Sequence, residues 1–272
     1  GGPARADAVV SADARDRLLA TGAPLALVAL WEAAVAVGVL DPRFFPPPSL
    51  VVVTLGRLLA DGTLVGHTLV SVARVLGGFA IGGGVGLLLG LALGVARPLR
   101  VALEPVISAL YVIPKVAILP LVMLIFGLGE AAKVAIVAIA TFFVVAINTT
   151  AAVLEIEPIY LEAARAFGAR GTHLFAHVVL PGALPAIFTG LRLALGTALI
   201  VVIAAEFVAA KEGIGYFIWL AWNTLRPEAM FAGFVIIGVL GMLSHAAVHR
   251  TGARLMPWQT EGPPRDGRAE GG

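Results

Sequence analysis

The sequence contains no cysteine and few charged residues. Only 13% of its 272 residues are Asp, Glu, Lys or Arg, whereas soluble globular domains carry about 25%. Without cysteine the chain has no disulfide, no thiolate metal ligand and no thiol nucleophile. Its 32 glycines follow no three-residue period and lie within apolar runs, so the composition is neither collagen-like nor that of a disordered low-complexity chain. These absences argue against a water-soluble globular enzyme.

Motifs of catalysis and of nucleic-acid binding are missing as well. The sequence has no Gly-x-x-x-x-Gly-Lys-Ser/Thr loop, so we do not expect this chain to hydrolyse ATP. The pairs His173/His177 and His245/His249 have i, i+4 spacing but lack the adjacent Glu and the third ligand of zinc proteases. We therefore predict no metal site and no cofactor in this chain. The 19 Lys and Arg residues are scattered and the net charge is only +2, which gives nucleic-acid binding no support.

What the sequence does contain is apolar. Hydrophobic residues make up 59% of the chain, and the mean hydropathy is +0.97. A helix that crosses a ~30 Å hydrocarbon layer needs roughly 20 apolar residues. Six stretches can supply such a helix: residues 23–40, 69–96, 101–126, 131–153, 186–209 and 229–249. We predict an all-α polytopic membrane helix bundle with about six transmembrane helices.

The few charges within these stretches indicate which helices face protein or a cavity. Three stretches contain long runs without Asp, Glu, Lys or Arg, which are Val75–Ala96, Val134–Leu154 and Ala229–Val248. The other three carry charged residues: Glu32; Glu104 and Lys115; Arg192 and Glu206. Because a charge facing lipid is costly, we expect these helices to face the bundle interior.

Basic residues in the loops set the predicted orientation. With a cytoplasmic amino terminus, the inside segments hold eleven of them: Arg5, Arg15, Arg17, Arg97, Arg100, Arg165, Arg170, Arg250, Arg254, Arg265 and Arg268. The outside segments hold five: Arg43, Arg57, Lys133, Lys211 and Arg226. This excess predicts that both termini are cytoplasmic. Residues 1–20 are then a cytoplasmic tail, residues 21–250 the transmembrane domain and residues 251–272 a disordered cytoplasmic tail.

The second stretch carries a regular glycine series. Its members recur at every fourth residue: Gly78, Gly82, Gly86, Gly90 and Gly94. Residues at i, i+4 lie on one face of a helix, so this face is almost bare backbone. Small residues on one face permit close approach of a second helix, and we therefore predict a tightly packed bundle rather than independent anchors.

Prolines and buried charges indicate a candidate translocation path. Pro114 and Pro120 interrupt the third stretch, and interrupted backbone at membrane depth is tolerated only beside protein or a water-filled cavity. Discontinuous helices of this kind line many transporter pathways. Pro114, Lys115 and Arg192 are therefore candidates for the path, although Arg192 can also reach the inner interface. For Glu206 we expect a structural ion pair, with Lys211 or Arg74.

The longest inside loop, residues 155–185, is too patterned to be a plain connector. Pro158 can begin a helix that ends at Gly168, and a second short amphipathic helix is expected before Leu180-Pro181. The loop contains Glu162-Ala163-Ala164, three residues, Gly168, nine residues, Val178, one residue and Leu180-Pro181. This spacing resembles the EAA signature of permease subunits of binding-protein-dependent ATP-binding-cassette (ABC) importers of the type I fold, with Val where Ile is usual.

The resemblance extends over roughly residues 45–250. In this range the sequence is similar to the nitrate/sulfonate/taurine/bicarbonate subgroup of these permeases. Segments that carry it are Pro47-Pro48-Ser49, His67–Phe79, Pro120-Leu121, Phe126–Glu130, Ala205-Glu206-Phe207 and Gly213-Ile214-Gly215. It implies a multi-pass protein of the bacterial inner membrane that forms a homodimer. It also implies two cytoplasmic subunits that bind ATP and Mg, and an extracytoplasmic solute-binding protein.

The resemblance also implies a role for the loop as an ATPase-coupling helix. Ala163 and Ala164 would permit close contact with the ATPase, Glu162 would supply a charged anchor and Gly168 a sharp turn, while Leu180 and Pro181 complete the motif. The expected substrate is a small anion such as an aliphatic sulfonate, taurine or nitrate. Bicarbonate, a pyrimidine precursor or an aromatic acid are alternatives. An ion-coupled secondary transporter is a further alternative, although the internal repeats or buried acid relay expected of one are not found.

Overall fold

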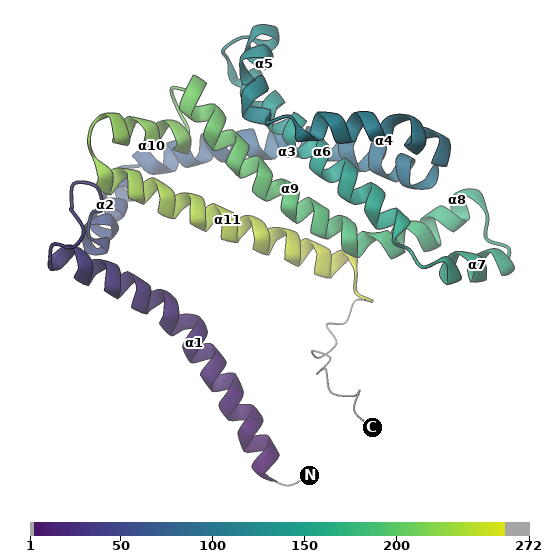
Figure 1. The fold of residues 1–272 in the computed structure, drawn as a ribbon, viewed down its shortest axis with the longest axis horizontal. Coiled ribbons are helices and arrows are strands. Elements are labelled where there is room, and N and C mark those ends of the chain that lie inside the picture. Colours follow the sequence, from purple (N-terminus) through teal and green to yellow (C-terminus); the bar gives the residue numbers. More distant parts are fainter. Residues whose placement is uncertain (1–2, 259–272) are drawn as a thin grey trace. The chain divides into compact units, whose positions relative to one another are not determined.

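A computed structural model describes residues 3–258 as helices joined by short turns, and Figure 1 shows their order along the chain. The α-helices are α1 (Pro3–Ala36), α2 (Pro48–Ala60), α3 (Thr63–Val95), α4 (Arg97–Val112), α5 (Leu119–Phe126), α6 (Glu130–Leu154), α7 (Pro158–Ala166), α8 (Gly171–Leu174), α9 (Leu180–Ala209), α10 (Ile214–Asn223) and α11 (Pro227–Leu255). A 3-10 turn, η1 (Lys115–Ile118), precedes α5, and a π-helical turn, η2 (Phe175–Val179), precedes α9. The predicted all-α class is confirmed, since residues 3–258 contain no strand.

The chain forms two compact units. The smaller unit comprises the chain up to His67 together with Phe217–Ile236, and the larger unit comprises Thr68–Tyr216 together with the chain from Ile237. In the smaller unit the Glu32 carboxylate accepts hydrogen bonds from the backbone N–H of Ser49 (2.9 Å) and from its hydroxyl (2.8 Å), at the first turn of α2. Glu32 therefore faces protein, as its place in an apolar run predicts.

Fewer helices can cross a membrane than the predicted six. Among the described residues, four helices are long and apolar enough, or five if α4 and the η1–α5 segment form one span. In α1 the apolar segment that the structure describes in full is Gly22–Ala36, and the helix ends at Ala36. The predicted span over residues 23–40 is therefore too long, because Gly38 adopts φ +79° in the turn after α1.

The third predicted span, residues 101–126, is two helices rather than one. The axes of α4 and the η1–α5 segment are bent by 88°. Pro114 lies in the break and adopts an extended conformation (φ −59°, ψ 120°), and Pro120 lies in the first turn of α5, where its missing N–H has no helical partner to lose. The prolines thus produce a sharp turn instead of a kink in a continuous helix.

The core of the larger unit is built around α6. Helices α6 and α9 pack along each other, and α5 and η1 contact α6 as well. One hydrophobic cluster joins these elements and α3, with Val75, Leu119, Ile136, Val137 and Val202 all buried. A second cluster joins the end of α6 to η2 and to the start of α9. Helix α6 is therefore the element around which the others in this unit pack.

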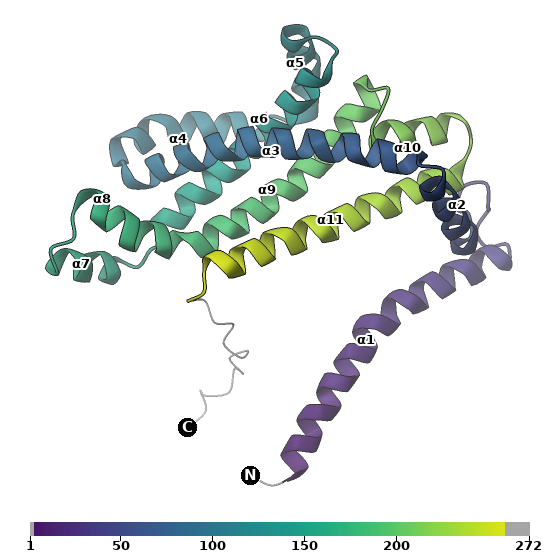
Figure 2. The same ribbon diagram turned by 180° about the vertical axis from the view of Figure 1, so that it is seen from behind.

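The glycine series of α3 lies against α6 (Figure 2). A Cβ added at Gly78 would lie 2.5 Å from the Cβ of Val137, one at Gly86 2.6 Å from the carbonyl oxygen of Phe142, and one at Gly90 2.6 Å from the Cβ of Thr149. At Gly82 it would overlap the carbonyl oxygen of Ala138. At Gly94 it would lie 2.5 Å from the Cβ of Val153. Real Cβ atoms do not approach this closely, so only glycine fits along this contact.

Three helix boundaries differ from the prediction. The loop over residues 155–185 ends earlier, because α8, η2 and α9 form one continuous helix over Gly171–Ala209. The wide π turn lies just before Pro181, whose ring would otherwise clash with the preceding turn. Helix α1 begins at Pro3, within the predicted amino-terminal tail, and α11 continues to Leu255, within the predicted disordered tail. Residues 259–272 lie outside the described residues.

Candidate functional site

Helix α7 ends in a turn that requires glycine. Pro158 occupies its first position, where a missing N–H costs nothing. At its carboxyl end the N–H of Gly168 bonds the carbonyl of Arg165, and the N–H of Ala169 bonds the carbonyl of Ala164, both at 2.9 Å. This is the Schellman arrangement, and it places Gly168 in the left-handed region at φ +86°. The position of Gly168 in the motif therefore has a local physical cause.

One face of α7 is held by the bundle and the opposite face is uncovered. Leu161 packs against the hydrophobic cluster at the start of α9. In contrast, Ile159 is 64%, Tyr160 60% and Phe167 93% exposed. Isolated exposed apolar residues are ordinary, but three on α7 and its carboxyl cap are typical of a contact surface.

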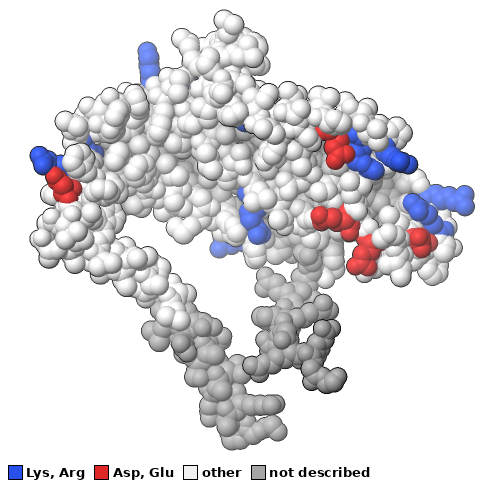
Figure 3. Space-filling view, in the orientation of Figure 1, with Lys and Arg blue, Asp and Glu red and all other residues white. Residues whose placement is uncertain are grey.

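The other motif residues differ in their exposure. Glu162 and Ala163 are exposed, and Ala164 is half-buried. Leu180 and Pro181 are half-buried at the first turn of α9, so the motif ends where the long helix begins. Figure 3 shows charged side chains gathered around the end of the larger unit that carries α7 and α8. A single short turn therefore separates α7 from the continuous helix Gly171–Ala209 that contains α9.

The candidate path residues occupy two separate places. The Lys115 ammonium donates hydrogen bonds to the carbonyls of Leu110, Tyr111 and Ile113 at 2.8–2.9 Å, and lies 4.5 Å from the centre of the Phe143 ring. It thereby caps the carboxyl end of α4, at the bend marked by Pro114. Arg192 lies on α9 beside a different cavity, described below. The structure thus does not bring Lys115 and Arg192 into one site.

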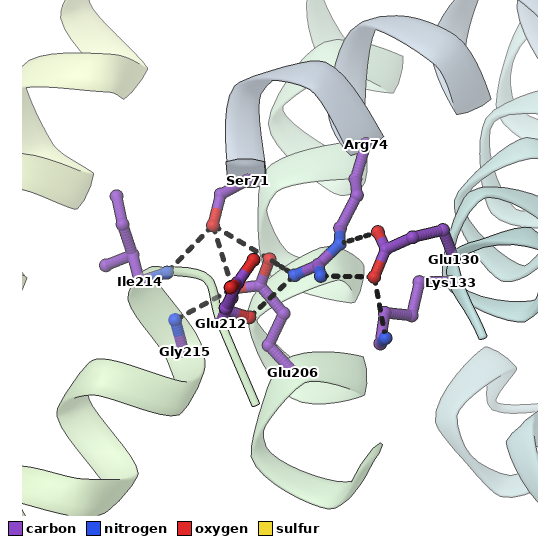
Figure 4. Close-up of polar contacts among 8 residues, drawn as sticks. All are labelled: Ser71, Arg74, Glu130, Lys133, Glu206, Glu212, Ile214 and Gly215. Atoms are coloured by element: carbon purple, nitrogen blue, oxygen red, sulfur yellow. Dashed lines mark hydrogen bonds and ion pairs between the residues drawn. The ribbon is translucent and has the colours of Figure 1, made fainter. Parts of the chain in front are cut away.

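Sequence reasoning missed most of a buried ion cluster (Figure 4). Glu206 on α9 is fully buried, and its carboxylate pairs with Nη1 of Arg74 on α3 at 2.7 Å. It also accepts hydrogen bonds from the Ser71 hydroxyl and from the backbone N–H of Gly215 at 2.8 Å. The expected structural pairing of Glu206 is confirmed, with Arg74 rather than Lys211 as its partner.

The cluster continues to the start of α6. The Nε and Nη2 atoms of Arg74 each donate to Glu130 at 2.6 Å, and the Lys133 ammonium donates to the same carboxylate at 3.0 Å. Arg74 is 3% exposed whereas Glu130 is 62% exposed. Bidentate geometry and full hydrogen bonding are what make a buried pair tolerable. Figure 4 shows Arg74 between its two carboxylates, so it joins α3, α6 and α9.

The turn before α10 is shaped by the same cluster. Arg74 also donates to the carbonyl of Glu212 at 2.8 Å, and Ile214 donates its N–H to the Ser71 hydroxyl at 2.8 Å. Gly213 adopts φ +110°, and a Cβ there would overlap the Glu206 carboxylate. Two short motifs in the sequence contribute to this cluster: Ser71-x-x-Arg74, and Glu206 followed by Gly213-x-Gly215. Their residues contact one another in the structure.

A bundle with several helices that are long and apolar enough to cross a membrane is typical of a polytopic membrane protein. The chain belongs to the family of binding-protein-dependent transport system inner membrane components, whose model matches residues 82–256. It is a permease subunit of an ABC importer.

Two relatives are named as transport permeases. The chain is 38% identical over 235 residues to SsuC of Escherichia coli, named as an aliphatic sulfonates transport permease, covering 86% of this chain and 89% of that protein. It is 31% identical over 252 residues to the taurine transport system permease protein TauC of Escherichia coli, covering 91% and 92%.

The fold is similar to that of a solved transporter. A chain of the MetNI methionine ABC transporter, solved in inward-facing conformations, matches with a TM-score of 0.57 at 23% identity, covering 71% of this chain and 92% of that one. The bent α4–α5 pair and the long α3, α6, α9 and α11 helices thus belong to a type I permease fold.

Proposed function

We propose that two copies of this chain form the translocation path of an ATP-driven importer for a small sulfonate-type anion such as an alkanesulfonate or taurine. Two cytoplasmic subunits would bind ATP and Mg, and an extracytoplasmic binding protein would deliver the substrate. The proposal places the chain in the inner membrane with both termini cytoplasmic, as the excess of basic residues in the inside loops predicts.

The exposed face of α7 is the observation that carries this proposal. A helix with Ile159, Tyr160 and Phe167 uncovered has unsatisfied apolar surface of the kind that a partner subunit buries. Because α8, η2 and α9 continue as one helix, displacement of α7 by a closing ATPase would be passed to α9 as a rigid-body motion. This mechanism would open the path to one side of the membrane and then to the other.

The proposed substrate class rests on the names of the relatives and on the basic residues Lys115 and Arg192 in the predicted spans. The relatives SsuC and TauC are named for aliphatic sulfonates and taurine. An anion that leaves water needs compensating positive charge, and Pro114, Lys115 and Arg192 remain the proposed path residues. Since Lys115 is held by three carbonyls, it would have to exchange those bonds to contact a substrate.

Two variants of the motif test the coupling role. Glu162→Lys reverses the exposed charge on α7, and Gly168→Asp places a charged side chain in the left-handed turn. We expect both to reach the membrane in normal amounts while uptake falls at least tenfold. The control for charge reversal is Glu212→Lys, which changes an exposed side chain outside the α7 loop. The control for the turn is Gly168→Asn, because Asn tolerates this backbone conformation.

The partners and the substrate are tested together. The chain is purified with co-expressed neighbouring subunits, and ATPase activity is measured with the binding protein and a panel of taurine, alkanesulfonates, nitrate, bicarbonate and aromatic acids. Stimulation by the sulfonates is the expected result. Failure of any ATPase to copurify, or normal uptake by both motif variants, would contradict the proposal.

A further inference from the structure

A large cavity lies between the start of α9 and the end of α11 in the larger unit. Its volume is about 840 Å³, and residues of both helices line it, from Pro185 to Arg192 and from Val248 to Met256. It lies at the end of α9 that begins directly after η2. No acidic residue is among those that line it. The cavity is separate from the ion cluster of Arg74 and Glu206 and is used by none of the contacts described above.

Arg192 is the charged side chain among the residues that line this cavity, and one of its donor atoms has no acceptor. Its Nε is buried without a hydrogen bond, and among the residues whose side chains the structure describes no carboxylate forms an ion pair with it. The other basic residues in the long apolar segments differ, since Arg74 has two carboxylates and Lys115 has three carbonyls. A buried guanidinium donor without an acceptor is costly, and this cost would be removed by an anion in the cavity.

The remaining walls are mixed. Phe188, Val248 and Met256 supply apolar surface, and Thr189 and His249 supply polar groups. The wall is closely packed at Gly252, because an added Cβ there would lie 3.2 Å from both the Phe188 ring and the terminal methyl of Met256. Inorganic sulfate or phosphate would leave this apolar surface unused. A ligand with an anionic head and an apolar body would satisfy both the guanidinium and the walls.

We propose that this cavity binds an amphiphilic oxyanion, a sulfonate or phosphate group on an apolar body, and that Arg192 donates hydrogen bonds to the oxyanion. A guanidinium matches two oxygens of such a group in a bidentate manner. Two sources share this chemistry, which are a free alkanesulfonate and the headgroup of an anionic phospholipid. The bound anion bridges α9 and α11, so binding stabilises the chain against unfolding.

Binding is tested on the full chain in lipid nanodiscs. In the first arm the lipid is phosphatidylcholine, and 1-butanesulfonate or methanesulfonate is titrated while calorimetry records binding. In the second arm phosphatidylglycerol is mixed in, and native mass spectrometry records the lipid retained by the chain. We expect affinity for the sulfonates to rise by about fourfold for each methylene that becomes buried. The arm in which binding is observed identifies the source of the anion.

Three variants make the test specific. Arg192→Gln is expected to weaken binding at least tenfold, because a charged hydrogen-bonding partner is lost. The matched control is Arg250→Gln, which removes an exposed charge from the neighbouring turn of α11 without touching the cavity and leaves binding within about twofold. Ala253→Leu keeps Arg192 but fills part of the cavity from an exposed position, and it is also expected to weaken binding.

The proposal is overturned if Arg192→Gln binds the ligands as well as the wild type does in both arms. It is also overturned if Arg250→Gln weakens binding as much as Arg192→Gln does. If Arg192→Gln does not fold, unchanged binding by Ala253→Leu overturns it instead. No ATPase, binding protein or uptake assay enters these measurements. Failure of the importer function proposed above and failure of this site are therefore separate results.

Discussion

The buried ion pair between Arg74 and Glu206 yields the sharpest stability prediction. In Glu206→Gln the side chain keeps its shape but loses its charge. The amide oxygen of Gln can still accept one hydrogen bond, from Gly215 or from Ser71. Its NH₂ group, however, is a donor, and it takes the place of a carboxylate oxygen that accepts a hydrogen bond in the wild type. Arg74 keeps Glu130 as its remaining carboxylate partner. The substitution therefore removes the negative charge of the Arg74–Glu206 ion pair without creating a cavity.

The expected loss follows from these contacts. Removing one partner of a buried ion pair costs about 3–5 kcal/mol, and the lower end applies because Arg74 retains Glu130. We expect the free energy of unfolding to fall by about 3 kcal/mol, which corresponds to a decrease in Tm of roughly 6–12 °C for a chain of this size. Thermal unfolding of the purified chain, followed by intrinsic tryptophan fluorescence in one fixed detergent, measures this change.

Glu212→Gln is the matched control for Glu206→Gln. The two residues lie at either side of the same turn and lose the same charge. However, the Glu212 side chain is exposed, and Arg74 bonds only its backbone carbonyl. We expect a change below about 1 kcal/mol for the control. An equal loss of stability in both variants, or a Tm of Glu206→Gln within 2 °C of wild type, would refute the reasoning.

Three further predictions concern other helices. Gly82→Ala places a Cβ against the Ala138 carbonyl and should destabilise the chain by about 3 kcal/mol. Its control is Gly84→Ala, in open space on the same helix, which should be neutral or stabilising. Chemical unfolding measures the stability of both variants. Gly168→Ala should cost about 1–2 kcal/mol at φ +86° and Gly168→Asn less, as protease sensitivity of the α7 loop will report. Lys115→Met removes a cap from three carbonyls and should lower stability by about 1–2 kcal/mol; an unchanged Tm would argue against the cap.

Features with a short-range pattern could be read from the sequence. The glycine series of α3 predicts one bare helix face because its period matches the helical repeat, and the structure places that face against α6. The end of the helix at Gly168 likewise follows from the local preference of glycine for the left-handed conformation. The family assignment depended on a motif within about twenty residues, and the comparison with relatives confirms it.

Features that depend on distant residues could not be read in this way. Ser71 on α3 contacts Glu206 on α9, and Glu130 and Lys133 on α6 are linked to Glu206 through Arg74. No spacing rule relates these three segments. The 88° bend between α4 and α5 was also not predictable, since a proline in an apolar run is compatible with a kink or with a full turn. The first span was overestimated because hydropathy continues past the residue where α1 ends.

The glycine contact between α3 and α6 limits how the permease can move. Sliding α3 along α6 by less than a full glycine repeat would drive backbone into side chains such as Val137 and Val145, and a shift by four residues would take ~6 Å. We therefore expect the two helices to move as one rigid body, which the ion pair between Arg74 and Glu206 joins to α9. Accordingly, we expect any change between outward and inward states to take place outside the contact between α3 and α6.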